Sequence, residues 1–245
     1  MLIRTNICLL LFVGLFACTP GVPTDSEVSQ DSERQDSLWQ VAFLIMDGVY
    51  NTELTAPYDI FQHTIFREGI RPMRVFTIAN TEMPVQTFEG LKILPDYNYL
   101  TDELPRIDIL VVPSAEHHLD TDLEDQALLD FVRKAAGQAQ YVTSHCDGAF
   151  VLAQAGLLEG VASTTFPADI PAYREMFPAL EVIDSVWFVH DSKFITSAGG
   201  ARSFEAALYL CEHLYGAEIA RRLAQGLVID WDLKQVPHFI AESAL

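Results

Sequence analysis

Cys146 is the residue of this chain whose type and position best suit chemistry. Segment 140–156 passes from a β-branched run through Ser-His-Cys-Asp-Gly into an alanine-rich run. This order is typical of a nucleophile elbow, a sharp strand-to-helix turn that exposes its central side chain. Unpaired N–H groups at the start of such a helix favour a thiolate and stabilise an oxyanion. The other interpretation of Cys146 is a small apolar side chain in the core.

Three further segments place polar or small residues directly after a predicted strand. Residues 47–53 bring a carboxylate, Glu53, to the start of a helix, where it could also serve only the helix dipole. Residues 114–118 read Ser-Ala-Glu-His-His, and residues 196–200 end in paired glycines that permit a tight turn or a close backbone approach. Ligands of parallel α/β folds bind beyond the carboxyl ends of the strands, so we expect these segments around Cys146.

The elements that must position these residues alternate between strand and helix. Such alternation predicts an α/β fold, a three-layer α/β/α sandwich with a mostly parallel central sheet. Continuous apolar runs predict its buried strands, and helical spacing of apolar residues predicts its helices. Strands are expected at residues 41–46, 73–79, 107–113 and 140–144, hairpins at 85–94 and 185–197, and helices at about 53–66, 122–136, after the elbow and from 202 onward.

The N-terminal residues 1–17 have the early charge and short apolar stretch of a signal peptide. Leu15-Phe-Ala-Cys18 resembles a bacterial lipobox, which predicts cleavage before Cys18 and a lipid on its thiol; simple cleavage is the alternative. Residues 18–38 are polar and acidic and predict a disordered tether, and residues 39–245 predict a single domain. We therefore expect a lipid-anchored protein of the bacterial cell envelope, facing away from the cytoplasm, at the outer membrane if the host is Gram-negative.

Charge and cysteine content narrow the possible partners. The formal net charge of −19, without a basic cluster, excludes nucleic acid as a favoured partner because phosphates would be repelled. Cys211 lies on the apolar side of a helical pattern and is expected to pack in the core. Cys146 is therefore the cysteine to which chemistry is assigned.

Four segments of the chain resemble the ThiJ/PfpI family of the class I glutamine amidotransferase-like superfamily. They cover residues 41–61, 107–114, 144–167 and 195–224, and the third, Cys-x-Gly-Ala-Phe-x-Leu-Ala-x-Ala-Gly-Leu-Leu-x-Gly-x-x-x-Thr-Thr, is the longest. Within the family the chain is most similar to the branch that holds isonitrile hydratase and the amidase-like sensor domains of some AraC-type regulators. The resemblance implies a flavodoxin-like sandwich and a homodimer.

The resemblance also implies roles for site residues. Cys146 would be the nucleophile, and Glu53 would be hydrogen-bonded to its sulfur as the acid/base partner. Backbone N–H groups of Asp147 and of the loop at Ser114 and Ala115 would form the oxyanion hole, with Gly148 completing the pocket. The Ser114 loop would then be the opposite wall of the site.

Two positions depart from the family pattern. Phe166 follows Thr-Thr where members with glyoxalase or deglycase chemistry carry a histidine, and Asp147 stands where peptidase-like members have histidine after the cysteine. Asp147 would oppose a thiolate by Coulomb repulsion. Deglycase and peptidase activities are therefore less favoured than hydration.

Three histidines lie in the predicted site loops. His117, His118 and His145 are possible auxiliary bases, and with Glu116 they could bind a metal. Adjacent side chains rarely ligate one ion together, so we expect no metal and no cofactor.

The sequence supports two functional hypotheses. The first is an envelope-anchored, cysteine-dependent hydrolase or hydratase that acts on a small electrophilic molecule, similar to isonitrile hydratase. The alternative is a noncatalytic module of the same fold that binds a small ligand or senses redox state. Phe166 and Asp147 favour the alternative, since both remove an expected base.

Overall fold

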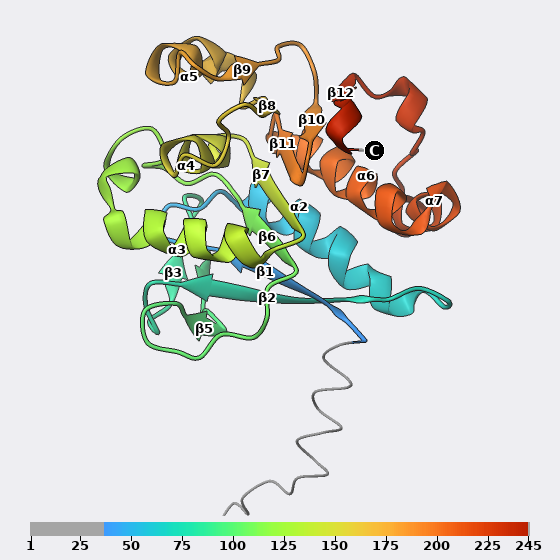
Figure 1. Cartoon of the computed structure of the whole chain (residues 1–245). Helices are drawn as coiled ribbons and strands as arrows, with labels where there is room; N and C mark the ends of the chain where they lie inside the picture. The colour runs from blue at the N-terminus through green and yellow to red at the C-terminus, as the bar shows by residue number, and fades with distance from the viewer. Residues whose placement is uncertain (1–36, 245) are drawn as a thin grey trace, which may run out of the picture.

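An eight-stranded sheet forms the centre of the computed structural model, which describes residues 37–244 (Figure 1). The strands lie in the order β12-β10-β11-β7-β6-β1-β2-β5, and β10 and β11 form the antiparallel pair among otherwise parallel neighbours. Their bounds are β1 Trp39–Leu44, β2 Met73–Ala79, β5 Tyr97–Asn98, β6 Ile109–Val112, β7 Tyr141–His145, β10 Phe188–Asp191, β11 Phe194–Ser197 and β12 His238–Ile240.

Helices cover both faces of this sheet (Figure 1). On one face lie α2 (Asn51–Gln62), α6 (Ser203–Tyr215) and α7 (Ala217–Gly226); on the other lie α3 (Gln126–Gln138) and α4 (Gly148–Gln154), with α5 (Ile170–Met176) beyond them. Successive β1 residues alternate between the two cores, Val41 and Phe43 toward α6, Ala42 and Leu44 toward α3. The predicted three-layer sandwich is confirmed.

Short elements complete the described chain. Two small sheets pair β3 (Val85–Gln86) with β4 (Lys92–Ile93) and β8 (Ala162–Ser163) with β9 (Glu181–Val182). Single 3-10 turns are η1 His63–Phe66, η2 Thr121–Glu124, η3 Pro167–Asp169, η4 Gly200–Arg202, η5 Leu233–Gln235 and η6 Glu242–Ala244.

The structure differs from the sequence predictions mainly at short elements. The hairpin at 85–94 is confirmed, whereas β5, β8, β9 and β12 were not predicted because two or three residues are too few to show a strand period. The later hairpin turns at Ser192 and Lys193, one residue beyond the predicted turn, because Asp191 pairs with Phe194.

The predictions for the N-terminal segment lie outside the described residues. They are the signal peptide at 1–17, the lipidation of Cys18 and nearly all of the tether at 18–38. Within the described chain, 37–244, no helix combines the length and apolar character that crossing a bilayer requires.

Candidate active site

Cys146 occupies a strained turn between β7 and α4. Its φ is 54°, in the left-handed region that side chains rarely adopt, and its N–H donates to the carbonyl of Ser197 at 3.0 Å. The turn lies at the carboxyl edge of the parallel strands, where β1 is flanked by β6 on one side and β2 on the other. The predicted nucleophile elbow therefore has the backbone geometry of one.

Two glycines allow the neighbouring backbone to press against this turn. A Cβ on Gly148 would stand 2.1 Å from the carbonyl oxygen of Val112, and one on Gly199 would stand 2.2 Å from the Cβ of Cys146. Gly199 also has φ of 75°. The close backbone approach that the paired glycines predicted is thus made by Gly199, at the cysteine itself.

The thiol of Cys146 is buried among polar groups. Its Sγ donates to Oδ2 of Asp147 at 3.5 Å, and the cysteine is only 7% exposed. Burial, followed by the negative charges of Asp147 and Glu53, raises the pKa of the thiol well above its ordinary value. The Ser114 hydroxyl and the Asp147 N–H act in the opposite direction and favour the thiolate less strongly. Asp147 therefore opposes thiolate formation, as the sequence predicted.

Glu53 approaches the thiol from α2 without bonding to it. Its Oε1 accepts a hydrogen bond from the N–H of Gly200 at 2.8 Å, and its side chain is buried. Within residues 37–244 no hydrogen bond joins Glu53 to Cys146, so the predicted bond to sulfur is corrected. The amide at the start of η4 holds the carboxylate instead, and Glu53 acts on the thiol through its charge.

Asp147 has the most perturbed carboxyl group of the site. Burial, with the charge of Asp169 as the next cause, raises its pKa from 3.8 to about 6. Its Oδ1 lies 3.0 Å from Oγ1 of Thr165, which also lies 3.1 Å from the Cys146 carbonyl oxygen. This carboxyl group can change protonation near neutral pH.

The loop after β6 supplies the wall opposite the elbow. The carbonyl of Ser114 accepts from the N–H of Tyr50 at 3.0 Å, and its hydroxyl is buried. The N–H of Ala115 donates to Nδ1 of His118 at 3.2 Å, so it is used inside the loop. Of the predicted oxyanion-hole donors, the N–H groups of Asp147 and Ser114 then remain as the candidates.

None of the three predicted histidines hydrogen-bonds to the thiol. His118 and His145 are buried, and burial lowers the pKa of each to about 3, so both rings are neutral at pH 7. His117 is exposed and pairs with Asp120 at 3.1 Å. Throughout residues 37–244, no group of three or more histidine, cysteine, aspartate or glutamate side chains is arranged to hold a metal ion.

Three residues of the site were not predicted from the sequence. Tyr50 lies close enough to Cys146 for the charge of the thiolate, after burial, to raise the pKa of its phenol. Thr165 and Asp169 reach Asp147 from the segment that follows β8. Thr165 belongs to the Thr-Thr motif, which was a signal for it, whereas nothing local marked Tyr50 or Asp169.

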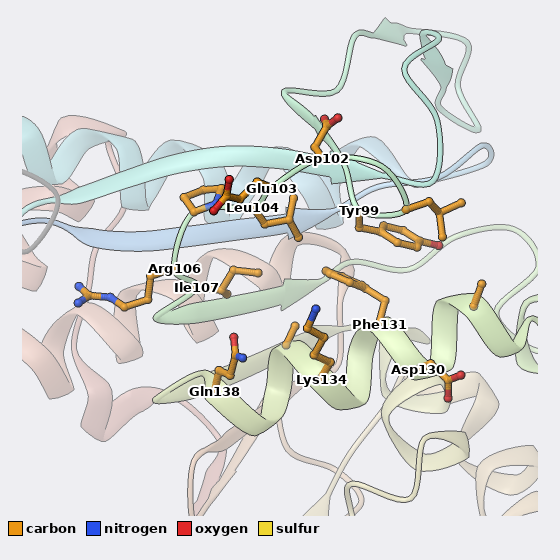
Figure 2. A pocket seen from close by; sticks show the side chains of 14 residues that line it. Tyr99, Asp102, Glu103, Leu104, Arg106, Ile107, Asp130, Phe131, Lys134 and Gln138 are labelled. Carbon is orange, nitrogen blue, oxygen red and sulfur yellow. The ribbon is translucent and has the colours of Figure 1, made fainter. Parts of the chain in front are cut away.

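One cavity is separate from the elbow. It measures about 620 Å³ and lies between α3 and the segment that enters β6, with Tyr99 and Phe131 on its wall (Figure 2). A smaller opening of about 370 Å³ lies nearer the site, lined by Gly48, Phe88 and Glu116 among others. Phe88 packs on Tyr50 with ring centroids 4.7 Å apart, so this opening adjoins the approach to Cys146.

Comparison with known proteins gives a consistent result. The model of the DJ-1/PfpI family matches residues 39–213. An isonitrile hydratase of Pseudomonas putida is 32% identical over 185 residues, covering 74% of this chain and 75% of that protein. The HTH-type transcriptional regulator GbdR of Pseudomonas aeruginosa is 23% identical over 86% of this chain, which matches 54% of the regulator. The crystal structure of a THiJ/PfpI family protein from Pseudomonas syringae superposes with a TM-score of 0.67 at 24% identity, covering 88% of this chain and 85% of that one.

Proposed function

The chain belongs to the DJ-1/PfpI family, and we propose that it is a cysteine-dependent hydratase or hydrolase of a small electrophilic molecule. Isonitriles are the first substrate class to test, because an isonitrile hydratase is among its relatives. The observation that carries the proposal is the strained elbow, which holds a single buried thiol against two carboxylates and a serine hydroxyl.

In the proposed reaction, Sγ of Cys146 attacks the isonitrile carbon and that carbon gains a proton, giving a thioimidate. Water then adds to the same carbon, the C–S bond breaks, and the products are an N-substituted formamide and the restored thiol. Glu53 is the acid/base partner for the water, and the N–H groups of Asp147 and Ser114 stabilise the oxygen that carries developing charge.

The charges around Cys146 favour an uncharged substrate. Those that act on the thiol come from carboxylates, Asp147 and Glu53, and no lysine or arginine of the described chain is among them. A substrate that carries its own carboxylate would be repelled in this buried site. Methyl isocyanoacetate should therefore be turned over in preference to isocyanoacetate.

Turnover of isonitriles by the purified protein tests the proposal. Formamide production, followed by mass spectrometry, should be lost in Cys146→Ser and retained in Cys211→Ala, which removes the other described thiol. Turnover that persists in Cys146→Ser would exclude the nucleophile, and absence of turnover in the wild type across uncharged isonitriles and small amides would favour the second function.

That second function is a noncatalytic ligand-binding or redox-sensing module. The raised pKa of the thiol favours the ligand-binding form of this module, because a neutral thiol is a weak nucleophile and also oxidises slowly. Peroxide treatment followed by mass mapping distinguishes the two: a sensor should oxidise at Cys146 under conditions in which no substrate is consumed.

Envelope anchoring and dimerisation belong to the proposal and rest on the sequence. A lipid on Cys18 would anchor the protein in a bacterial membrane, and Cys18→Ala should release it into the soluble fraction. A homodimer is expected by analogy with the family, and sedimentation of the purified protein measures it.

A further inference from the structure

We propose that the side chain of Asp147 is the group that exchanges a proton with Cys146, taking it from the thiol as sulfur attacks and delivering it to the substrate. The inference rests on the proposed function and assigns its first proton transfer, which neither the family match nor the likeness to isonitrile hydratase assigns to this side chain.

The geometry selects Asp147. Its Oδ2 is the acceptor of the hydrogen bond that Sγ donates, at 3.5 Å, and the two residues are adjacent in the same turn. Its Oδ1 is held by Oγ1 of Thr165 at 3.0 Å, which leaves Oδ2 directed at sulfur. A base must lie within reach of the proton that it abstracts, and this carboxylate does.

The other titratable groups near the thiol make no hydrogen bond to it within the described chain. Glu53 accepts from the N–H of Gly200 through Oε1 and makes no hydrogen bond to sulfur within the described chain. Nδ1 of His118 accepts from the N–H of Ala115, and among residues 37–244 neither ring nitrogen of His145 has a hydrogen-bond partner, Cys146 included. Asp147 is thus the titratable side chain that contacts the reacting atom.

The surroundings of Asp147 suit a base that works near neutral pH. Asp169 faces it from η3, Glu53 from α2, and Tyr50 from the turn before α2, while Cys146 precedes it in the elbow. Burial and then the charge of Asp169 raise the pKa of Asp147 to about 6, so it is largely ionised at pH 7 and still holds a proton readily. A base with its pKa close to the working pH is favoured in general acid/base catalysis.

The proton balance closes within the turn. As Sγ forms its bond to the isonitrile carbon, the S–H proton passes to Oδ2 of Asp147, and the neutral carboxyl group then protonates that carbon. No free thiolate is needed, so the raised pKa of the thiol does not prevent attack. The negatively charged carboxylate of Asp147 opposes a free thiolate, but it can accept the proton of the thiol during attack.

The test is the pH dependence of iodoacetamide alkylation of Cys146 in the full-length protein. Peptide mapping by mass spectrometry separates Cys146 from the other cysteines, and iodoacetamide serves as the electrophile. The wild type should show a rise in rate near pH 6, when Asp147 ionises, and a second rise at high pH, when the thiolate forms. Asp147→Asn should lose the first rise and react about tenfold or more slowly at pH 7.

Asp169→Asn should move the first rise to lower pH, since it removes the charge that raises the pKa of Asp147. Asp169 is the N-cap residue of α5 but its side chain makes no cap hydrogen bond there, so an asparagine of the same size should disturb folding little. Glu175→Gln, at an exposed site in α5, is the matched control and should leave the profile unchanged.

Faster alkylation of Asp147→Asn at pH 7 would overturn the inference, because it would show that Asp147 only represses the thiolate. A single rise at high pH in the wild type would overturn it as well. A first rise that depends on Asp147, without turnover of any isonitrile, would support the proton exchange and reject the hydratase. Turnover of isonitriles without that rise would support the hydratase and reject the proton exchange by Asp147.

Discussion

Cys146 and Cys211 are both buried, and burial raises the pKa of both thiols. Cys211 lies in the middle of α6, is fully buried, and has apolar neighbours in the core between α6 and the sheet. Cys146 lies in a turn with φ of 54° and has carboxylate and hydroxyl neighbours. Burial and pKa direction therefore do not identify a nucleophile in this fold; a strained backbone together with buried polar groups does.

The largest difference between the elbow and other parts of the fold should appear when the space beside Cys146 is filled. Gly199→Ala should cost about 3 to 5 kcal/mol of unfolding free energy, because its Cβ would overlap the backbone of Cys146 at positive φ. Gly69→Ala, where φ is 77° and, apart from the adjoining residues, no atom of residues 37–244 lies within 4 Å of an added Cβ, should cost only about 1 kcal/mol. Urea denaturation measures both, and equal costs would mean that the elbow is not tightly packed.

The elbow could be predicted because its signals are local. Each signal lies within a few residues of the position that it describes: the strand before Cys146, the small residues after it, and the paired glycines at 199 and 200. The bond between Glu53 and Gly200 joins residues 147 positions apart, and the effect of Asp169 on Asp147 depends on how η3 packs beside the elbow. Such contacts are set by tertiary packing, so hydrogen bonds and charges at the site were predicted less well than the fold.

The raised pKa of Asp147 in the elbow can be tested through the pH dependence of the unfolding free energy. A raised pKa means that the folded state binds the Asp147 proton more tightly than the unfolded state does, so this stabilisation is complete below about pH 4 and is lost as pH rises through about 6. Asp147→Asn removes this dependence. The variant should gain stability over the wild type between pH 4 and pH 8 by at most about 3 kcal/mol, from 1.36 kcal/mol per pKa unit.

Denaturation midpoints at pH 4, 6 and 8 measure this gain, with Glu175→Gln as the exposed control. A constant difference between variant and wild type across the three values would show that Asp147 titrates normally. The elbow would then differ from α6 in its backbone alone.

Serine substitution at each of the two cysteines compares the elbow with α6 directly, and its effects on stability should be the smallest. Serine at 146 finds Asp147 as an acceptor, so Cys146→Ser should change stability by about 0.5 kcal/mol or less while it abolishes alkylation there. Serine at 211 places a hydroxyl in an apolar core, so Cys211→Ser should cost about 1 to 2 kcal/mol and leave the chemistry of the elbow intact. Urea midpoints and mass-mapped alkylation of the two variants measure both effects. A larger stability loss at 146 than at 211 would mean that the thiol of the elbow contributes mainly to packing. The chemical role assigned to its polar neighbours would then lose its support.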